Sequence, residues 1–169
     1  MITPEYLQTM ARYNRWQNNN LYTAAETLSD ADRRLDRGAF FRSIHETLVH
    51  ILWADEIWLS RFDVCEGPGG GIAQSTERYS AWTDLYEARK AMDTIVSDWA
   101  AEVKPAELEG DFTWFSGAMG REMTSPKWLI FTHIFNHATH HRGQVHAMLT
   151  AAGAKPHDTD LPFMPDSAP

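Results

Sequence analysis

Cysteine, basic clusters and long apolar runs are scarce or absent in this sequence. Its one cysteine, Cys65, excludes an internal disulfide and a cysteine-rich zinc site. Lysine and arginine number 15 against 23 acidic residues, which gives a formal net charge of −8. Because nucleic-acid binding depends mainly on basic patches, we expect no nucleic-acid partner. No segment approaches the roughly 18 consecutive apolar residues of a membrane span, so we expect no membrane partner either.

The composition is that of an ordinary globular protein, with 43% hydrophobic and 22% charged residues. The first residues lack the basic and then apolar regions of a secretory signal peptide, which favours a cytoplasmic location. A chain of 169 residues can bury a sizeable core without covalent staples. We therefore expect a single domain over residues 1–169.

Helix-capping signals and helix breakers divide the chain into four long predicted helices. Thr3-Pro4 is an N-cap followed by proline at the first helical position. Ser43-Ile-His-Glu46 has the pattern of a capping box, in which serine and glutamate satisfy free helical amides. Thr76 and Ser125 are the predicted caps of the last two helices, and Gly153 is the predicted final C-cap. The expected ranges are 4–28, 43–62, 76–103 and 126–152.

The segments between these helices have different compositions. Residues 63–75 are rich in glycine and predict a connection, whereas residues 111–125 predict a short β-hairpin before the last helix. The C-terminal tail, 155–169, contains prolines and no helical period, so we expect it to be extended. Four amphipathic helices without a repeated sequence predict an all-α fold, a four-helix bundle. The long middle links leave its topology open.

Histidines concentrate in the last predicted helix. The segment from His133 to His146 holds five of the eight histidines in the chain. At about 100° per residue, His141 falls inside the apolar stripe and His137 at its edge, whereas His146 points away. Two imidazoles four residues apart on one helix can hold a metal ion. The alternative is a pair of buried histidines that are satisfied by hydrogen bonds alone.

A third ligand should come from the predicted helix 43–62, which offers His45 and His50. Helical periodicity does not choose between these two. Asp55 falls within the apolar stripe of the same helix, either as a buried carboxylate paired with arginine or as a partner that orients a ligand imidazole. Gln144 faces the expected site and could orient a ligand or a bound water.

Other polar residues fit the site less well. The last helix contains no glutamate, which excludes a carboxylate-bridged di-iron centre and favours a mononuclear site. Arg142 faces away from the expected metal, so we assign it a structural ion pair. Cys65 has no paired histidine in the sequence, which argues against a nucleophilic role. His157 lies in the tail and, like His146, should be dispensable for metal binding.

Two motifs resemble those of the DinB family, a group of DinB/YfiT-like metalloenzymes. They are Ser43-Ile-His-Glu-Thr-Leu-Val-His50 and His137-x-x-x-His141-Arg142-Gly143-Gln144. The segments 13–18 and 160–164 are also similar, so the resemblance covers nearly the whole chain. It implies a four-helix bundle of up-down-down-up order, commonly a homodimer, with nickel or zinc held by three histidines. Carried over by position, the resemblance adds His50 to His137 and His141 and leaves out His45.

The resemblance also implies an activity on a small-molecule substrate. Relatives in this superfamily include transferases and isomerases that use a low-molecular-weight thiol. Three histidines on a divalent metal leave a position open for water or substrate, which is typical of catalytic sites. We therefore expect a thiol-dependent S-transferase or a metal-dependent hydrolase. The alternative is a non-catalytic metal- or ligand-binding protein of the stress response.

Overall fold

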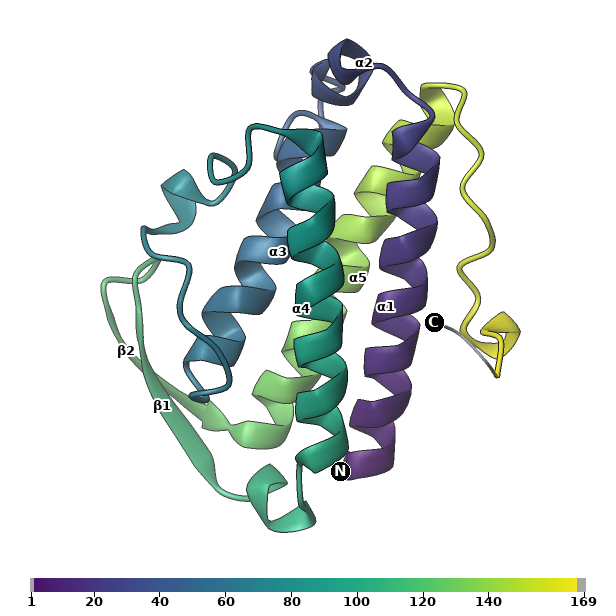
Figure 1. Cartoon of the computed structure of the whole chain (residues 1–169). Helices are drawn as coiled ribbons and strands as arrows, with labels where there is room; N and C mark the ends of the chain where they lie inside the picture. The colour runs from purple at the N-terminus through teal and green to yellow at the C-terminus, as the bar shows by residue number, and fades with distance from the viewer. Residues whose placement is uncertain (1, 167–169) are drawn as a thin grey trace.

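The computed structural model describes residues 2–166, which are mostly helical with one small antiparallel sheet (Figure 1). The four long helices are α1 (Pro4–Glu26), α3 (Ile44–Ser60), α4 (Trp82–Glu102) and α5 (Lys127–Ala151). The shorter elements are α2 (Asp30–Arg34) and three 3-10 turns, η1 (Ile72–Gln74), η2 (Pro105–Leu108) and η3 (Leu161–Phe163). Strands β1 (Asp111–Ser116) and β2 (Arg121–Pro126) form a hairpin. The predicted helical class and the predicted hairpin are confirmed.

The four long helices pack around a common apolar core. In Figure 1, α1 and α5 run upward, whereas α3 and α4 run downward. Both α1 and α3 contact α4 and α5, so each long helix has two helical neighbours. Fully buried leucines and valines come from all four, and each contributes about 1.5–3 kcal/mol of hydrophobic stabilisation. They include Leu7, Leu21, Leu48, Leu52, Leu85, Val145 and Leu149.

The connection between α3 and α4 is long because these helices run in the same direction. Residues 61–81 return from the lower end of α3 to the upper end of α4 and pass outside the helices (Figure 1). This return carries the glycine-rich segment along the outer side of α3. In the part of the chain that the structure describes, no helix is long and apolar enough to cross a membrane.

Two helix starts follow the predicted capping signals. Thr3 Oγ1 accepts a hydrogen bond from the Tyr6 amide at 3.3 Å, with Pro4 in the first turn of α1. Ser43 Oγ accepts from the Glu46 amide at 3.1 Å and donates to Glu46 Oε2 at 2.9 Å. The Glu46 carboxylate therefore binds the serine hydroxyl rather than its amide, so only half of the predicted capping box forms.

The last helix ends at glycine, as predicted. Gly153 has a φ of +87°, a conformation that glycine adopts without a steric penalty. Its amide donates to the Thr150 carbonyl at 3.0 Å, and the Ala154 amide donates to the Leu149 carbonyl at 3.0 Å. These two bonds form a Schellman motif, which satisfies carbonyls that the helix itself leaves free.

The predicted start of the third long helix is wrong. α4 begins at Trp82, not at the Thr76 cap. The carbonyl of Tyr79, inside the predicted helix, accepts a hydrogen bond from His45 Nε2 at 2.7 Å. This bond ties the backbone at residue 79 to α3, and the first helical bond of α4 is accepted by the Ala81 carbonyl, from the Leu85 amide at 3.2 Å. A tertiary contact thus overrides the local signal.

The predicted cap of the last helix is also wrong. Ser125 and Pro126 belong to β2, where Pro126 is paired with Asp111. The Lys127 amide then donates to the Gly110 carbonyl at 3.0 Å. The hairpin therefore leads directly into α5, which begins without a side-chain cap.

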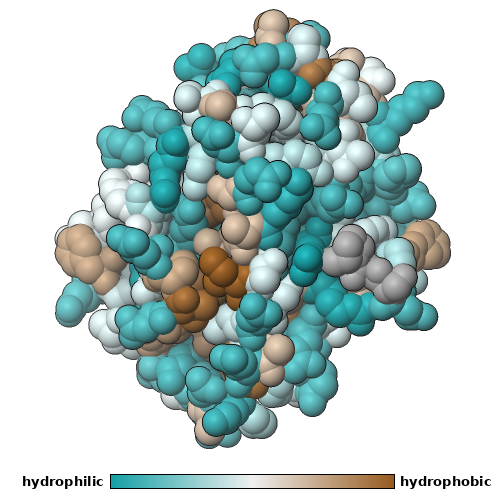
Figure 2. All heavy atoms as spheres, in the orientation of Figure 1, coloured by the Kyte–Doolittle hydropathy of each residue, from teal (hydrophilic) through white to brown (hydrophobic). Residues whose placement is uncertain are grey.

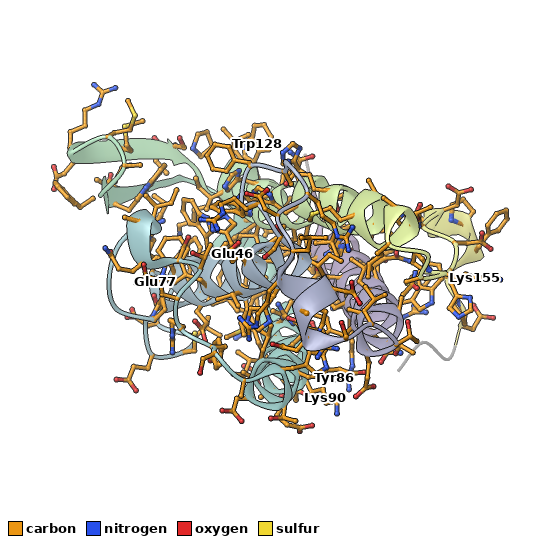
Figure 3. All side chains as sticks on the ribbon, turned by 90° about the horizontal axis from the view of Figure 1, so that it is seen from above. Glu46, Glu77, Tyr86, Lys90, Trp128 and Lys155 are labelled. Carbon is orange, nitrogen blue, oxygen red and sulfur yellow. The ribbon has the colours of Figure 1, made fainter. Side chains whose placement is uncertain are left out.

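The C-terminal tail runs back along α1 (Figure 1). The Tyr13 hydroxyl donates to the Thr159 carbonyl at 2.6 Å, and the Asn20 amide exchanges two hydrogen bonds with the His157 backbone. Seen from above, Lys155, near the start of the tail, lies on the opposite side of the molecule from the hairpin (Figure 3). Tyr13 and Asn20 of α1 therefore hold the tail against the helix.

Figure 2 shows a mostly hydrophilic face, with a few apolar side chains gathered between α3 and α4. A cavity of about 940 Å³ in this part of the molecule is lined by apolar residues such as Phe62, Val64 and Ile95 and by charged residues such as Glu102 and Lys104. No histidine is among its lining residues in the described part of the chain, so it is separate from the site described below.

Candidate metal centre

Three histidines converge from two helices. His50 comes from α3, whereas His137 and His141 lie one turn apart on α5. One ring nitrogen of each lies within 4.8 Å of the corresponding nitrogens of the other two. Within residues 2–166, these histidines form a group whose donor atoms could hold one metal ion. The fold thus brings together the three residues that the sequence and the resemblance selected.

The separation of the ring nitrogens fits a bound metal. Nε2 of His50 lies 3.4 Å from Nε2 of His137. A zinc–nitrogen bond is about 2.0–2.1 Å, so two imidazoles on a tetrahedral zinc ion place their nitrogens about 3.4 Å apart. The observed separation of the two nitrogens therefore equals the one that a shared tetrahedral ion requires.

Two of these imidazoles are oriented through their other nitrogen. His50 Nδ1 lies 2.9 Å from Ser75 Oγ, and His141 Nδ1 donates to Gln144 Oε1 at 2.9 Å. Both bonds orient the rings, and the Gln144 oxygen, which can only accept, places the proton of His141 on Nδ1 and leaves its Nε2 lone pair free for a metal. Gln144 therefore contacts a candidate ligand directly, and its amide also lies 3.2 Å from His140 Nε2.

The environment keeps the three imidazoles neutral. Burial, followed by the neighbouring His137 and His141, lowers the pKa of His50 to about 3. Burial and the other imidazoles, His141 first, also lower the pKa of His137 to about 3. Burial lowers the pKa of His141, although its bond to Gln144 acts in the opposite direction. Because a metal binds the deprotonated imidazole, all three are prepared as ligands near neutral pH.

Aromatic rings cover the site. Phe41 stacks on His50 with ring centroids 3.8 Å apart and lies 5.3 Å from the ring of His141. Trp53 stacks on His50 at 5.9 Å. These contacts limit the orientations of the His50 ring and keep bulk water from much of the centre. They leave one side of the site facing a cavity.

A cavity of about 460 Å³ opens beside His50 and His137, which both line it. Its volume lies within the range of small-molecule sites. Its walls come from α3, α5, the glycine-rich segment and the turn of the hairpin. The remaining lining residues are Trp53, Ala54, Ile57, Trp58, Arg61, Gly70, Gly71, Ile72, Trp114, Phe115, Ser116, Gly117, Ala118 and His133.

Asp55 belongs to a buried ion-pair network. Its carboxylate lies 2.6 Å from Arg89 Nη1, and both side chains are almost fully buried. Arg89 also lies 3.0 Å from Asp93, which accepts a hydrogen bond from Asn18 at 2.8 Å. Of the two roles that the sequence left open for Asp55, the structure favours the arginine pair over a contact with a ligand imidazole.

The remaining histidines lie outside the group of three. His45 is buried, but its Nε2 donates to a backbone carbonyl rather than facing His50. His146 is half-buried, not exposed as predicted, and lines a different cavity beside Arg142. His157 is exposed in the tail. None of these three belongs to the group that could hold a metal.

Arg142 and Cys65 contact groups other than the three histidines. Buried Arg142 donates to Asn14 Oδ1 and, at 3.0 Å, to Thr139 Oγ1. The predicted structural role agrees with this position, but its partners are an amide and a hydroxyl rather than a carboxylate. Cys65 Sγ lies 3.8 Å from the Glu56 carbonyl, and burial raises the pKa of its thiol.

Several site residues were not predicted from the sequence. Ser75 lies in the segment between two helices, and Phe41 lies ahead of the Ser43 cap. Arg61, just after the end of α3, and His133 of α5 line the cavity. Helical spacing could have indicated these two, since His133 lies one turn before His137 and Arg61 lies about three turns after His50. Ser75 reaches His50 because the segment between α3 and α4 runs back along α3, and the neighbouring residues give no indication of this contact.

Removal of either orienting partner should weaken metal binding. We expect Gln144→Ala and Ser75→Ala each to lower metal affinity by about 10- to 100-fold, because His141 or His50 then loses the bond that orients its ring. Competition with a chromogenic chelator measures the change. Thr150→Ala is a matched control on α5, since its hydroxyl bonds only the His146 carbonyl among the described residues. Equal affinity in all variants would show that these bonds do not support the ligands.

Acid should destabilise the metal-free protein between pH 6.5 and about 3. In this window the unfolded chain protonates histidines that the folded chain keeps neutral, since the pKa of both His50 and His137 falls from 6.5 to about 3 on folding. The free energy of unfolding should therefore fall as pH falls, by up to about 1.4 kcal/mol per pH unit for each histidine. Urea unfolding with a chelator at several pH values measures the slope. A His50→Asn/His137→Asn variant should show a flatter dependence, and an unchanged slope would contradict this explanation.

Comparison with known proteins agrees with the geometry. The chain matches the model of the DinB family over residues 1–169. It is also similar in fold to the crystal structure of a DinB-like protein from Bacillus cereus, with a TM-score of 0.63 and 16% sequence identity; the match covers 85% of this chain and 90% of that one. No protein of curated function matches the chain. Because the family model spans the full sequence, the chain belongs to the DinB family.

Proposed function

We propose that this protein is a mononuclear metalloenzyme that uses zinc or nickel, bound by His50, His137 and His141, in the S-transfer of a low-molecular-weight thiol. Its frame is a four-helix bundle of up-down-down-up order, in which α3 and α5 carry the site. One observation carries the proposal: three imidazoles converge, two of them at the wall of an aromatic-lined cavity large enough for a small substrate.

The donor set suits an open metal position. Three imidazoles supply neutral ligands and no negative charge, and two of them line the cavity. A divalent metal bound there would act as a Lewis acid and lower the pKa of a thiol or water beside it. Because the described site contains no cysteine and no carboxylate ligand, the metal's charge would remain available to a substrate.

The cavity walls position the reactants. Trp58 packs edge-on against Trp114 at 5.4 Å and against His133 at 5.3 Å, which gives a rigid apolar surface for an electrophile. His133 lies one turn from His137, and burial followed by the charge of Arg61 lowers its pKa, so it is neutral near pH 7. It is therefore placed to accept the thiol proton while the sulfur forms its bond to the electrophile and the leaving group departs with its electron pair.

A two-substrate assay tests this function. Metal-loaded protein is mixed with a panel of small thiols and 1-chloro-2,4-dinitrobenzene, and thioether formation is followed by absorbance. We expect turnover that needs both thiol and metal and that the His137→Ala/His141→Ala variant lacks. The His157→Ala variant should match the unmodified chain. Turnover of a chromogenic ester with metal alone would indicate hydrolysis, and tight metal binding without any turnover would indicate a binding protein.

A further inference from the structure

One face of α3 forms a continuous wall of the cavity. His50, Trp53, Ile57 and Trp58 of α3 line it together with Arg61, the residue after the end of the helix; the last four lie three, seven, eight and eleven positions after His50. Residues at these intervals share one helical face, so the wall runs in order from the metal ligand to the arginine. The middle of this wall is aromatic and aliphatic. Its two ends carry the groups that can bind charge.

Arg61 has no acidic partner in the part of the chain that the structure describes. Its guanidinium lies 4.3 Å from the centre of the Trp58 ring. Burial lowers its pKa, and no neighbouring acid acts in the opposite direction. By contrast, Arg78 and Arg89 pair with Glu56 and Asp55. Among residues 2–166, no carboxylate lies within ion-pair distance of Arg61.

The described lining of the cavity carries no negative charge. Although the chain carries a net charge of −8, none of the described lining residues is aspartate or glutamate. Arg61 is thus a half-buried cation in a pocket whose described lining offers no counter-charge. A ligand with an anionic oxygen would supply one.

The distance between the two ends limits the size of the ligand. Because the guanidinium stacks on Trp58, it lies near the level of that residue, eight positions along α3 from His50. At 1.5 Å per residue, this separation is about 12 Å. A ligand that contacts both ends must therefore be elongated, and a single small anion would reach only one of them.

We propose that Arg61 determines substrate specificity by binding a carboxylate, or a similar small oxyanion, at one end of an elongated substrate. The apolar or aromatic body of this substrate lies along Trp53 and Trp58, and its other end reaches toward His50 and His137. This inference rests on the proposed function, since it assigns the substrate class of the same cavity. A planar guanidinium suits this role because it binds a carboxylate through two parallel hydrogen bonds.

Paired probes separate charge from shape. The binding of 4-phenylbutanoate and of its uncharged analogue 4-phenylbutanamide is measured by calorimetry, with zinc-loaded and with metal-free protein. We expect the carboxylate to bind at least about tenfold more tightly than the amide in both forms. Arg61→Gln should abolish this preference, whereas Arg61→Lys should retain part of it. Arg12→Gln, which changes an arginine on α1, should behave like the unmodified chain.

The metal-free arm identifies the group that binds the anion. A carboxylate preference that disappears with the metal and survives in Arg61→Gln would assign the anion to the metal and overturn the proposal. Equal binding of the two probes, or no binding of either to the unmodified chain, would overturn it as well. Failure of the metalloenzyme proposal gives a different result, namely no metal uptake with the Arg61-dependent preference intact.

Discussion

Metal content should fall from about one divalent ion per chain to near zero when His137 and His141 are both replaced by alanine. Their nitrogens and that of His50 are the donors that the described structure groups together, so the double variant leaves one imidazole, which cannot hold the ion alone. Elemental analysis after dialysis measures the ratio. A single His50→Ala variant should lose most of the metal too, because its Nε2 is 3.4 Å from that of His137.

Two other histidines provide controls for the metal assignment. His146 lines a separate cavity, and His157 is exposed in the tail. Replacement of either by alanine should leave the metal content unchanged. Retention of a full metal ion by the double variant would disprove the proposed ligands, and loss of metal from His146→Ala would place the site elsewhere on α5.

Asp55→Ala should lower the free energy of unfolding by about 3–5 kcal/mol, because it leaves the buried Arg89 without one of its two carboxylates. Urea unfolding measures the loss. Asp30→Ala is the matched control: its pair with Arg34 has a similar distance, 2.8 Å, but is exposed. Exposed pairs contribute about 1 kcal/mol or less, so the control should lose little.

The same variant separates the two roles that the sequence left open for Asp55. If the carboxylate only balances Arg89, the folded fraction of Asp55→Ala should bind metal with unchanged affinity. A large loss of affinity in a variant that remains folded would show that Asp55 acts on the ligands. The measurement therefore combines chelator competition with circular dichroism on one sample.

Local sequence patterns correctly predicted the starts of two helices and the end of a third. Thr3, Ser43 and Gly153 act where their patterns predicted, because capping depends on hydrogen bonds within a few residues. The hairpin was predicted for the same reason, since its turn residues lie between its paired strands. Such features need no information about the rest of the chain.

Local patterns failed where a distant residue competes for the same backbone group. Thr76 has the chemistry of a cap, but α4 starts at Trp82 because the preceding segment bonds to α3 through the Tyr79 carbonyl. Ser125 likewise has the chemistry of a cap and is instead paired within the hairpin. Neither competing contact could be read from the neighbouring sequence.

By itself, the sequence determined which residues of the last helix share a face, so the 3.6-residue period was enough to select His137 and His141. It did not determine which histidine of α3 would meet them, because helical periodicity says nothing about how two helices lie against each other. Tertiary packing places His50, and not His45, beside His137, and it pairs Asp55 with Arg89. It also brings Ser75 to the site through the long connection between α3 and α4. The cavity has the same origin: its walls come from four segments far apart in the chain, and only their packing creates the space between them.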